Sequence, residues 1–278
     1  MSVQAMASSC GMVKAAVFIW ARQGREEYLR PMNTIPVLLL LSFAPAAYLC
    51  VAMYFKDKYE PEPKRLLFAA FLAGCLLMIP AGMIELFLMY VSGGRRPGLG
   101  HALFNAFAVA AMVEESLKFC VLRFHAYPKK DFNEPLDGIV YGSFIALGFA
   151  TVENVAYVLA NGFGTGIVRM FISVPGHYAW GVILGYYVGK AKFEPHNHLL
   201  HSLRGLVYAV LLHGAFDAFL FQKVTPVLWL LTLVTLVISL RIARREIKEL
   251  QADSFWRFGG KTAALAPLPV QKDPGASG

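Results

Sequence analysis

Two adjacent glutamates and a lysine lie inside an apolar stretch that is long enough to cross a membrane. The stretch covers 101–124 and contains Glu114, Glu115 and Lys118 near its middle. About 20 helical residues span the hydrocarbon core, and an ionisable group at its centre costs at least ~2.5–3.5 kcal/mol on insertion scales. On a helix Glu114 and Lys118 share a face, while Glu115 points about 100° away from Glu114. We therefore expect one carboxylate to pair with the lysine and the other to face a site, with a neutralised packing pair as the alternative.

Three later apolar stretches also carry polar side chains at helical spacing. They contribute, in order, Glu153 with Asn154, then His177, then His213 with Asp217. At ~1.5 Å of rise per residue, the glutamate pair, Glu153 and the two histidines fall within one slab about 10 Å thick, and Asp217 lies shallower. A shared, water-filled site requires such agreement in depth, whereas independent hydrogen bonds between helices do not. That structural alternative nevertheless exists for each of these residues.

Carboxylates and imidazoles at one depth could supply the catalytic groups for hydrolysis. A carboxylate can take a proton from water, and a histidine can donate a hydrogen bond to the developing oxyanion. The same groups could bind a divalent metal that activates water, or form a proton relay in a transporter. Serine and cysteine nucleophile motifs are absent from the sequence, as are His-Glu-x-x-His and Gly-x-Gly-Asp. The residues alone do not choose among these chemistries.

The composition indicates the elements that must position these groups. Of the 278 residues 57% are hydrophobic and only 16% are charged, against about 25% charged in soluble domains. We predict an all-α bundle of seven transmembrane helices, or eight if a short segment at 12–21 inserts. The predicted spans are 35–55, 66–91, 101–124, 137–160, 167–189, 205–221 and 225–240. The last of them continues as a charged helical extension to about 252. Residues 1–34 form a predicted tail or surface segment, 35–245 the membrane domain, and 246–278 a largely disordered tail.

The net charge of +8 does not indicate a nucleic-acid partner, because the basic residues lie at the ends of apolar stretches. The loops after the first, third and fifth predicted spans carry most of the lysine and arginine. By the positive-inside rule these loops and the C-terminus are cytoplasmic. We expect a multi-pass integral membrane protein.

Four short motifs in successive predicted spans resemble the PrsW family of intramembrane proteases. They are Glu114-Glu115-x-x-Lys118, Gly148-Phe149-x-x-x-Glu153-Asn154, His177-x-x-x-Gly181 and His213-x-x-x-Asp217. The resemblance covers about 111–219. The family is similar to the CAAX prenyl endopeptidases and to the scaffold subunit of gamma-secretase. The CAAX relatives have an arginine at longer spacing after the glutamate pair, so Lys118 favours the PrsW branch.

The resemblance implies a role for each matched residue. The implied catalytic residues are Glu114, Glu115, Glu153, His177 and His213, and the implied supporting residues are Lys118, Asn154 and Asp217. The implied cofactor is either none or a divalent metal such as zinc, which Glu115, His177 and His213 would hold. Analogy with the CAAX relatives slightly favours glutamate chemistry without a metal.

The expected function is that of an intramembrane endopeptidase that cuts a membrane protein in or next to its span, with an anti-sigma-factor-type regulator as one substrate. The expected partners are this substrate and the lipid bilayer, with no nucleic acid, and the oligomeric state is open. The resemblance also implies that the protein lies in the bacterial plasma membrane. A non-catalytic scaffold, a CAAX-type prenyl-protein endopeptidase and a small transporter are the alternatives.

Overall fold

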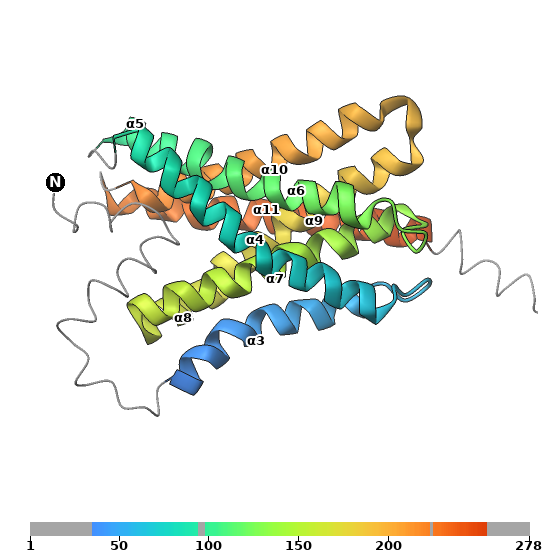
Figure 1. Ribbon diagram of the computed structural model, residues 1–278, viewed down its shortest axis with the longest axis horizontal. Helices are drawn as coiled ribbons and strands as arrows, with labels where there is room; N and C mark the ends of the chain where they lie inside the picture. Colours follow the sequence, from blue (N-terminus) through green and yellow to red (C-terminus); the bar gives the residue numbers. More distant parts are fainter. Residues whose placement is uncertain (1–34, 94–97, 223–224, 255–278) are drawn as a thin grey trace, which may run out of the picture.

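The computed structural model describes residues 35–93, 98–222 and 225–254, and all regular structure within them is helical (Figure 1). This confirms the all-α prediction. The extra segment predicted at 12–21 lies outside the described residues, as does the chain beyond 254. Five helical stretches are long and apolar enough to cross a membrane, and the total of seven or eight stays a prediction.

The five stretches correspond to six helices. They are α3 (Ile35–Tyr54), α4 (Lys64–Val91), α7 (Pro135–Asn161), α8 (Phe163–Phe171) with α9 (Ser173–Phe193), and α10 (His198–Phe221). The predicted third span is also helical, but it is divided into α5 (Leu99–Phe104), a π-helical segment (Asn105–Ala111), α6 (Met112–Val121) and a second π-helical segment (Leu122–Ala126). The last helix is α11 (Trp229–Ser254).

The helices α7 and α9 form the centre of the bundle, and most of their residues are buried (Figure 1). The outer helices α3 and α4 instead expose long apolar side chains, among them Leu40, Leu76 and Phe87. Such exposure is costly in water but not in lipid. The polar groups that the sequence places in α7 and α9 are therefore held in the interior of a membrane bundle.

Glycines allow α7 and α9 to touch backbone to backbone. A Cβ atom added to Gly142 would lie 2.5 Å from the carbonyl oxygen of Gly181, and one added to Gly181 would lie 2.7 Å from the carbonyl oxygen of Gly142. Gly185 likewise faces the backbone of Gly138. Small residues permit such close approach between membrane helices, so this contact fixes the spacing between the two central helices.

Helix α11 ends close to the predicted end of its charged extension at about 252. Helix α11 continues to Ser254, so the predicted domain boundary at 245 falls inside it. Its final turns bury Ile247 and Leu250, and Glu249 accepts a hydrogen bond of 2.6 Å from the Tyr186 hydroxyl on α9. Helix α10 also begins earlier than the predicted start at 205, because its first turns carry polar side chains that resemble a loop in the sequence.

The loop between α3 and α4 packs against the start of α7. Its Glu62 is 2% exposed and accepts a hydrogen bond from the Tyr141 hydroxyl on α7. Burial raises the pKa of Asp57 to about 6, and burial also raises the pKa of Glu62 to about 7. Acidic side chains are thus enclosed at the opposite end of α7 from Glu153.

Gly142→Ala should destabilise the protein, because the new methyl group would collide with the α9 backbone. Overpacking of this kind costs about 1–3 kcal/mol, which should appear as a lower midpoint of thermal unfolding in detergent. The matched control is Gly164→Ala on α8, where an added Cβ has no neighbour within 4 Å. Equal unfolding midpoints for the two variants would contradict the close contact.

Candidate functional site

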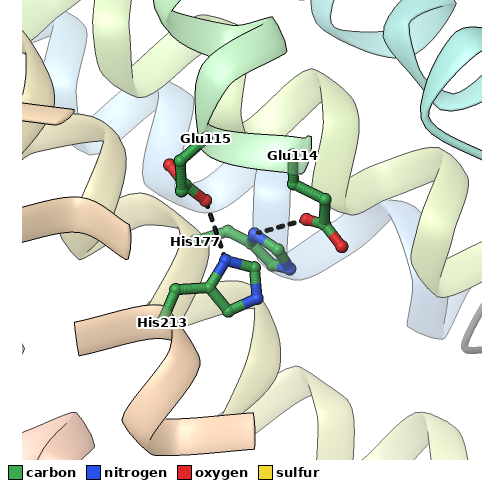
Figure 2. A group of neighbouring side chains, drawn as sticks. All are labelled: Glu114, Glu115, His177 and His213. Atoms are coloured by element: carbon green, nitrogen blue, oxygen red, sulfur yellow. Dashed lines mark hydrogen bonds and ion pairs between the residues drawn. The ribbon is translucent and has the colours of Figure 1, made fainter. Parts of the chain in front are cut away.

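The glutamate pair lies in the first turn of α6, directly after a π-helical segment. A π turn takes an extra residue and rotates the side chains that follow it, and such turns are frequent at functional sites. Glu114 is 5% exposed and Glu115 is fully buried. Figure 2 shows both carboxylates turned toward the imidazoles of His177 on α9 and His213 on α10.

Lys118 contacts both glutamates, and this corrects the prediction that it pairs with only one. Its Nζ lies 3.1 Å from Glu114 Oε2 and 2.8 Å from Glu115 Oε1. Nζ also lies 3.1 Å from His177 Nδ1 and 4.2 Å from the centre of the Phe149 ring. A lysine ammonium has three donors, and a long side chain reaches neighbours at both i−3 and i−4. A single buried cation therefore joins three side chains of the group.

The contacts of His177 indicate which of its nitrogens carries the proton. An ammonium can only donate, so His177 Nδ1 accepts from Lys118. The Nε2–H of His177 is then the donor to Glu153 Oε2, at 2.9 Å. Glu153 thus lies on the far side of the imidazole from the glutamate pair and holds the ring in place.

His213 is held between two carboxylates and an indole. Its Nδ1 lies 2.9 Å from Glu115 Oε1, and its Nε2 lies 3.5 Å from Asp217 Oδ2. The ring stacks on Trp180 with 4.0 Å between centroids and 12° between planes. The Trp180 indole N–H in turn donates to Ser239 Oγ on α11, at 3.2 Å. His213 therefore has little rotational freedom.

Arg169 is a functional candidate that the sequence analysis missed. Its guanidinium pairs with Glu153 Oε2 at 2.7 Å and donates to Asn154 Oδ1 at 3.0 Å. In the sequence it was counted only as a topology-setting charge near the start of the predicted span at 167–189. Its position relative to Glu153 could have indicated the contact. Glu153 lies nine residues before the turn at Gly162, and Arg169 lies seven residues after it. Side chains at similar distances from a helix–helix turn tend to face one another.

A buried cavity of about 120 Å³ opens beside this group. That volume holds several water molecules. The polar side chains that line it include Glu114, Glu153, His177, His213 and Asp217. Glu115 is not among its lining residues. The two glutamates therefore differ, since Glu114 faces the cavity and Glu115 lies behind it.

The inner group also fits a divalent metal. Glu114, Glu115, His177 and His213 each offer one ligand atom, and these atoms lie within 4.8 Å of one another. Two imidazoles and a carboxylate are a common ligand set of catalytic zinc. Glu115 Oε2 is buried without a hydrogen-bond partner, and each imidazole has a carboxylate on its outer nitrogen, as metal-bound histidines usually do. Because the Lys118 ammonium occupies the space between three of these side chains, it and a metal ion would exclude each other there.

Comparison with known proteins matches this chain to one family of membrane proteases. Residues 62–242 match the family described as PrsW family intramembrane metalloprotease. The chain is 38% identical to Protease PrsW of Geobacillus kaustophilus, with 67% of this chain and 80% of that protein covered. It is 36% identical to Protease PrsW of Bacillus subtilis, with 65% and 81% covered, and 34% identical to that of Clostridioides difficile, with 65% and 77% covered. No solved structure shows a significant match.

Arg169→Met should destabilise the protein by about 3 kcal/mol or more, because it leaves Glu153 as a buried charge without its guanidinium partner. Adding Glu153→Gln should recover part of that loss, with a coupling energy of about 1–3 kcal/mol in the double-mutant cycle. Unfolding in mixed micelles measures all four proteins. Arg204→Met, at an exposed position on α10, is the control. Strictly additive losses would show that the ion pair contributes no coupling.

Proposed function

This chain belongs to the PrsW family of intramembrane proteases, and we propose that it cuts a membrane protein at the cavity beside Glu114. One observation carries the assignment of the site: α6, α7, α9 and α10 each contribute a carboxylate or an imidazole to a single buried cavity. Helix-to-helix hydrogen bonds with no shared task would not require a cavity there. The substrate is a membrane protein because the cavity lies inside a bundle of apolar helices.

Glu114 is the general base in this proposal. Its carboxylate faces the cavity, where it can accept a proton from an attacking water molecule. The same carboxyl group then returns the proton to the leaving amide nitrogen. Lys118 holds the carboxylate in position and balances its charge. Glu115, which does not face the cavity, positions His213 through the contact with Nδ1.

His213 stabilises the oxyanion. Its Nε2 contact with Asp217 is long, at 3.5 Å, so an N–H at this atom remains able to donate to a substrate oxygen in the cavity. Fixed donors of this type typically contribute about 10²–10³-fold in rate. His177 is oriented by Glu153, which Arg169 holds from the other side. Asn154 links this pair to the backbone of α3 through long contacts to Leu41 and Ser42.

The metal alternative uses the same residues. The family is described as a metalloprotease, which favours a bound metal over the metal-independent chemistry expected by analogy with the CAAX relatives. Glu115, His177 and His213 would hold the ion, leaving Glu114 as the base. A divalent metal in this place would polarise the scissile carbonyl and make bound water more acidic.

The remaining parts of the proposal concern topology and substrate class. The distribution of lysine and arginine supports a plasma-membrane protein whose C-terminus is cytoplasmic. A single-span regulator of the anti-sigma-factor type would fit a cavity enclosed by apolar helices.

Glu114→Gln and Glu115→Gln should each lower cleavage at least ~100-fold, because they remove the base and the partner of His213. The assay uses protein in liposomes with a panel of single-span membrane peptides and reads the products by mass spectrometry. Glu194→Gln, at an exposed loop position, is the control. Wild-type cleavage by both site variants would refute the assignment. If the two variants instead lost folding, or lost binding to partner proteins, the result would indicate a scaffold role.

Metal dependence has a separate prediction. The metal alternative predicts that purified protein contains about one equivalent of metal, and that removal of the metal by a chelator abolishes cleavage until zinc is restored. Lys118→Met should bind zinc more tightly in competition with a chromogenic chelator, because the competing ammonium is gone. Lys192→Met, at the far end of α9, is the control. Full cleavage by protein with less than about a tenth of an equivalent of metal would support direct glutamate chemistry.

A further inference from the structure

A second group of carboxylates lies far from the candidate site. It comprises Asp57, Glu60 and Glu62 in the loop between α3 and α4, and Glu134 and Asp137 at the start of α7. We call this group the acidic cap. Asp137 and Glu153 are sixteen residues apart on α7, so the cap and the candidate site are separated by about 24 Å along that helix.

The acidic cap is buried. Asp57, Glu62 and Glu134 are at most 2% exposed, and Asp137 is fully buried. Removing several carboxylates from water costs several kcal/mol per ion unless an opposite charge is close. Among the described residues, the ion pairs of the bundle join lysine, arginine and histidine to other carboxylates and not to Asp57, Glu62 or Asp137. The cap therefore encloses several carboxyl groups, and no basic side chain of the described residues is in direct contact with these three.

Each of these three carboxylates has one oxygen that is held and one that is not. Asp57 Oδ2 accepts the Glu62 N–H at 2.9 Å, and Glu62 Oε2 accepts the Tyr141 hydroxyl. Asp137 Oδ2 accepts two backbone N–H groups of the α7 cap, at 2.7 and 2.8 Å. The second oxygens, Asp57 Oδ1, Glu62 Oε1 and Asp137 Oδ1, are buried and have no hydrogen-bond partner in the described part of the chain. Helix capping thus explains one oxygen of Asp137 and leaves the other unexplained.

The spacing of the carboxylates suits a cation. Asp57, Glu134 and Asp137 each offer an oxygen within 4.8 Å of the other two, and Asp137 forms a second such group with Glu60 and Glu62. The ligands are oxygens alone, with no imidazole or thiolate. Such a set selects hard divalent cations, Mg²⁺, Ca²⁺ or Mn²⁺, and not zinc.

We propose that the acidic cap binds one hard divalent cation through Asp57, Glu134 and Asp137, and that this ion ties the loop between α3 and α4 to the start of α7. Two hydrogen bonds already connect the region to the end of α11: Ser254 Oγ donates to Glu134 at 2.8 Å, and the Gln251 side chain donates to the Lys56 carbonyl at 2.6 Å. The ion would offset part of the negative charge of the cap and hold the α3–α4 loop against the start of α7, to which Ser254 joins the end of α11. The site is structural, and it does not depend on the proposed function.

The first test measures the thermal unfolding of the full chain in detergent. Protein stripped with EDTA and dialysed receives Mg²⁺, Ca²⁺ or Mn²⁺ at constant ionic strength. At about 100 times the Kd, a bound cation should raise the unfolding midpoint by about 5 °C or more. Asp57→Asn should lose this increase, whereas Asp253→Asn, an exposed acid on α11, should keep it. No increase with any of the three cations, or an equal increase in Asp57→Asn, would overturn the proposal.

The second test needs no variant that alters the ligands. Terbium is a hard cation whose emission is sensitised by nearby tyrosine, and Tyr141 bonds directly to Glu62 in the cap. Wild-type protein should show sensitised terbium emission that Ca²⁺ or Mg²⁺ displaces, and Tyr141→Phe should reduce it several-fold. Emission that zinc displaces but Ca²⁺ and Mg²⁺ do not would assign the ion to the Glu114 site and overturn the proposal. The terbium measurement on wild-type protein can therefore refute the proposal even if Asp57→Asn does not fold.

Discussion

The buried Lys118 ammonium is the interaction on which the candidate site depends. It contacts Glu114, Glu115 and His177 at about 3 Å. Two adjacent carboxylates in the interior of a membrane bundle repel each other and lose their hydration, and a single cation between them offsets both costs. The same ammonium fixes the tautomer of His177, and through it the partnership with Glu153. The Lys118 ammonium also lies where a metal ion would bind. A metal ion could therefore bind to these side chains only if it displaced the ammonium.

The distance between helices determines whether these side chains can meet at all. Gly142 and Gly181 let α7 and α9 touch backbone to backbone. This contact places Glu153 within hydrogen-bond reach of His177 on the neighbouring helix. Larger residues at the glycine positions would separate the helices, and a hydrogen bond tolerates a change of only a few tenths of an ångström. The close packing of α7 against α9 is therefore required for the geometry of the site.

Much of the site could be predicted from the sequence, because ionisable groups stand out in apolar spans. Glu114, His177 and His213 were identified in this way, and their estimated depths indicated that they would converge. The sequence could not show which glutamate faces the cavity, since that depends on the π-helical turn before α6. Arg169 was missed because an arginine near a span end also reads as a topology signal. The charged extension of the last span to about 252 was predicted, but the burial of Ile247 and Leu250 in its final turns was not.

The hydrogen bond from Trp180 to Ser239 has a consequence for how the site forms during synthesis. Trp180 is the wall against which the His213 ring is stacked, and its indole is anchored by α11, the last helix that the structure describes. A ribosome makes the glutamate pair more than a hundred residues before Ser239. Until α11 packs against α9, the Trp180 indole lacks its hydrogen bond to Ser239, and the His213 ring stacks on a side chain that is free to move. A growing chain therefore carries the reactive side chains of the site well before it carries the geometry that aligns them.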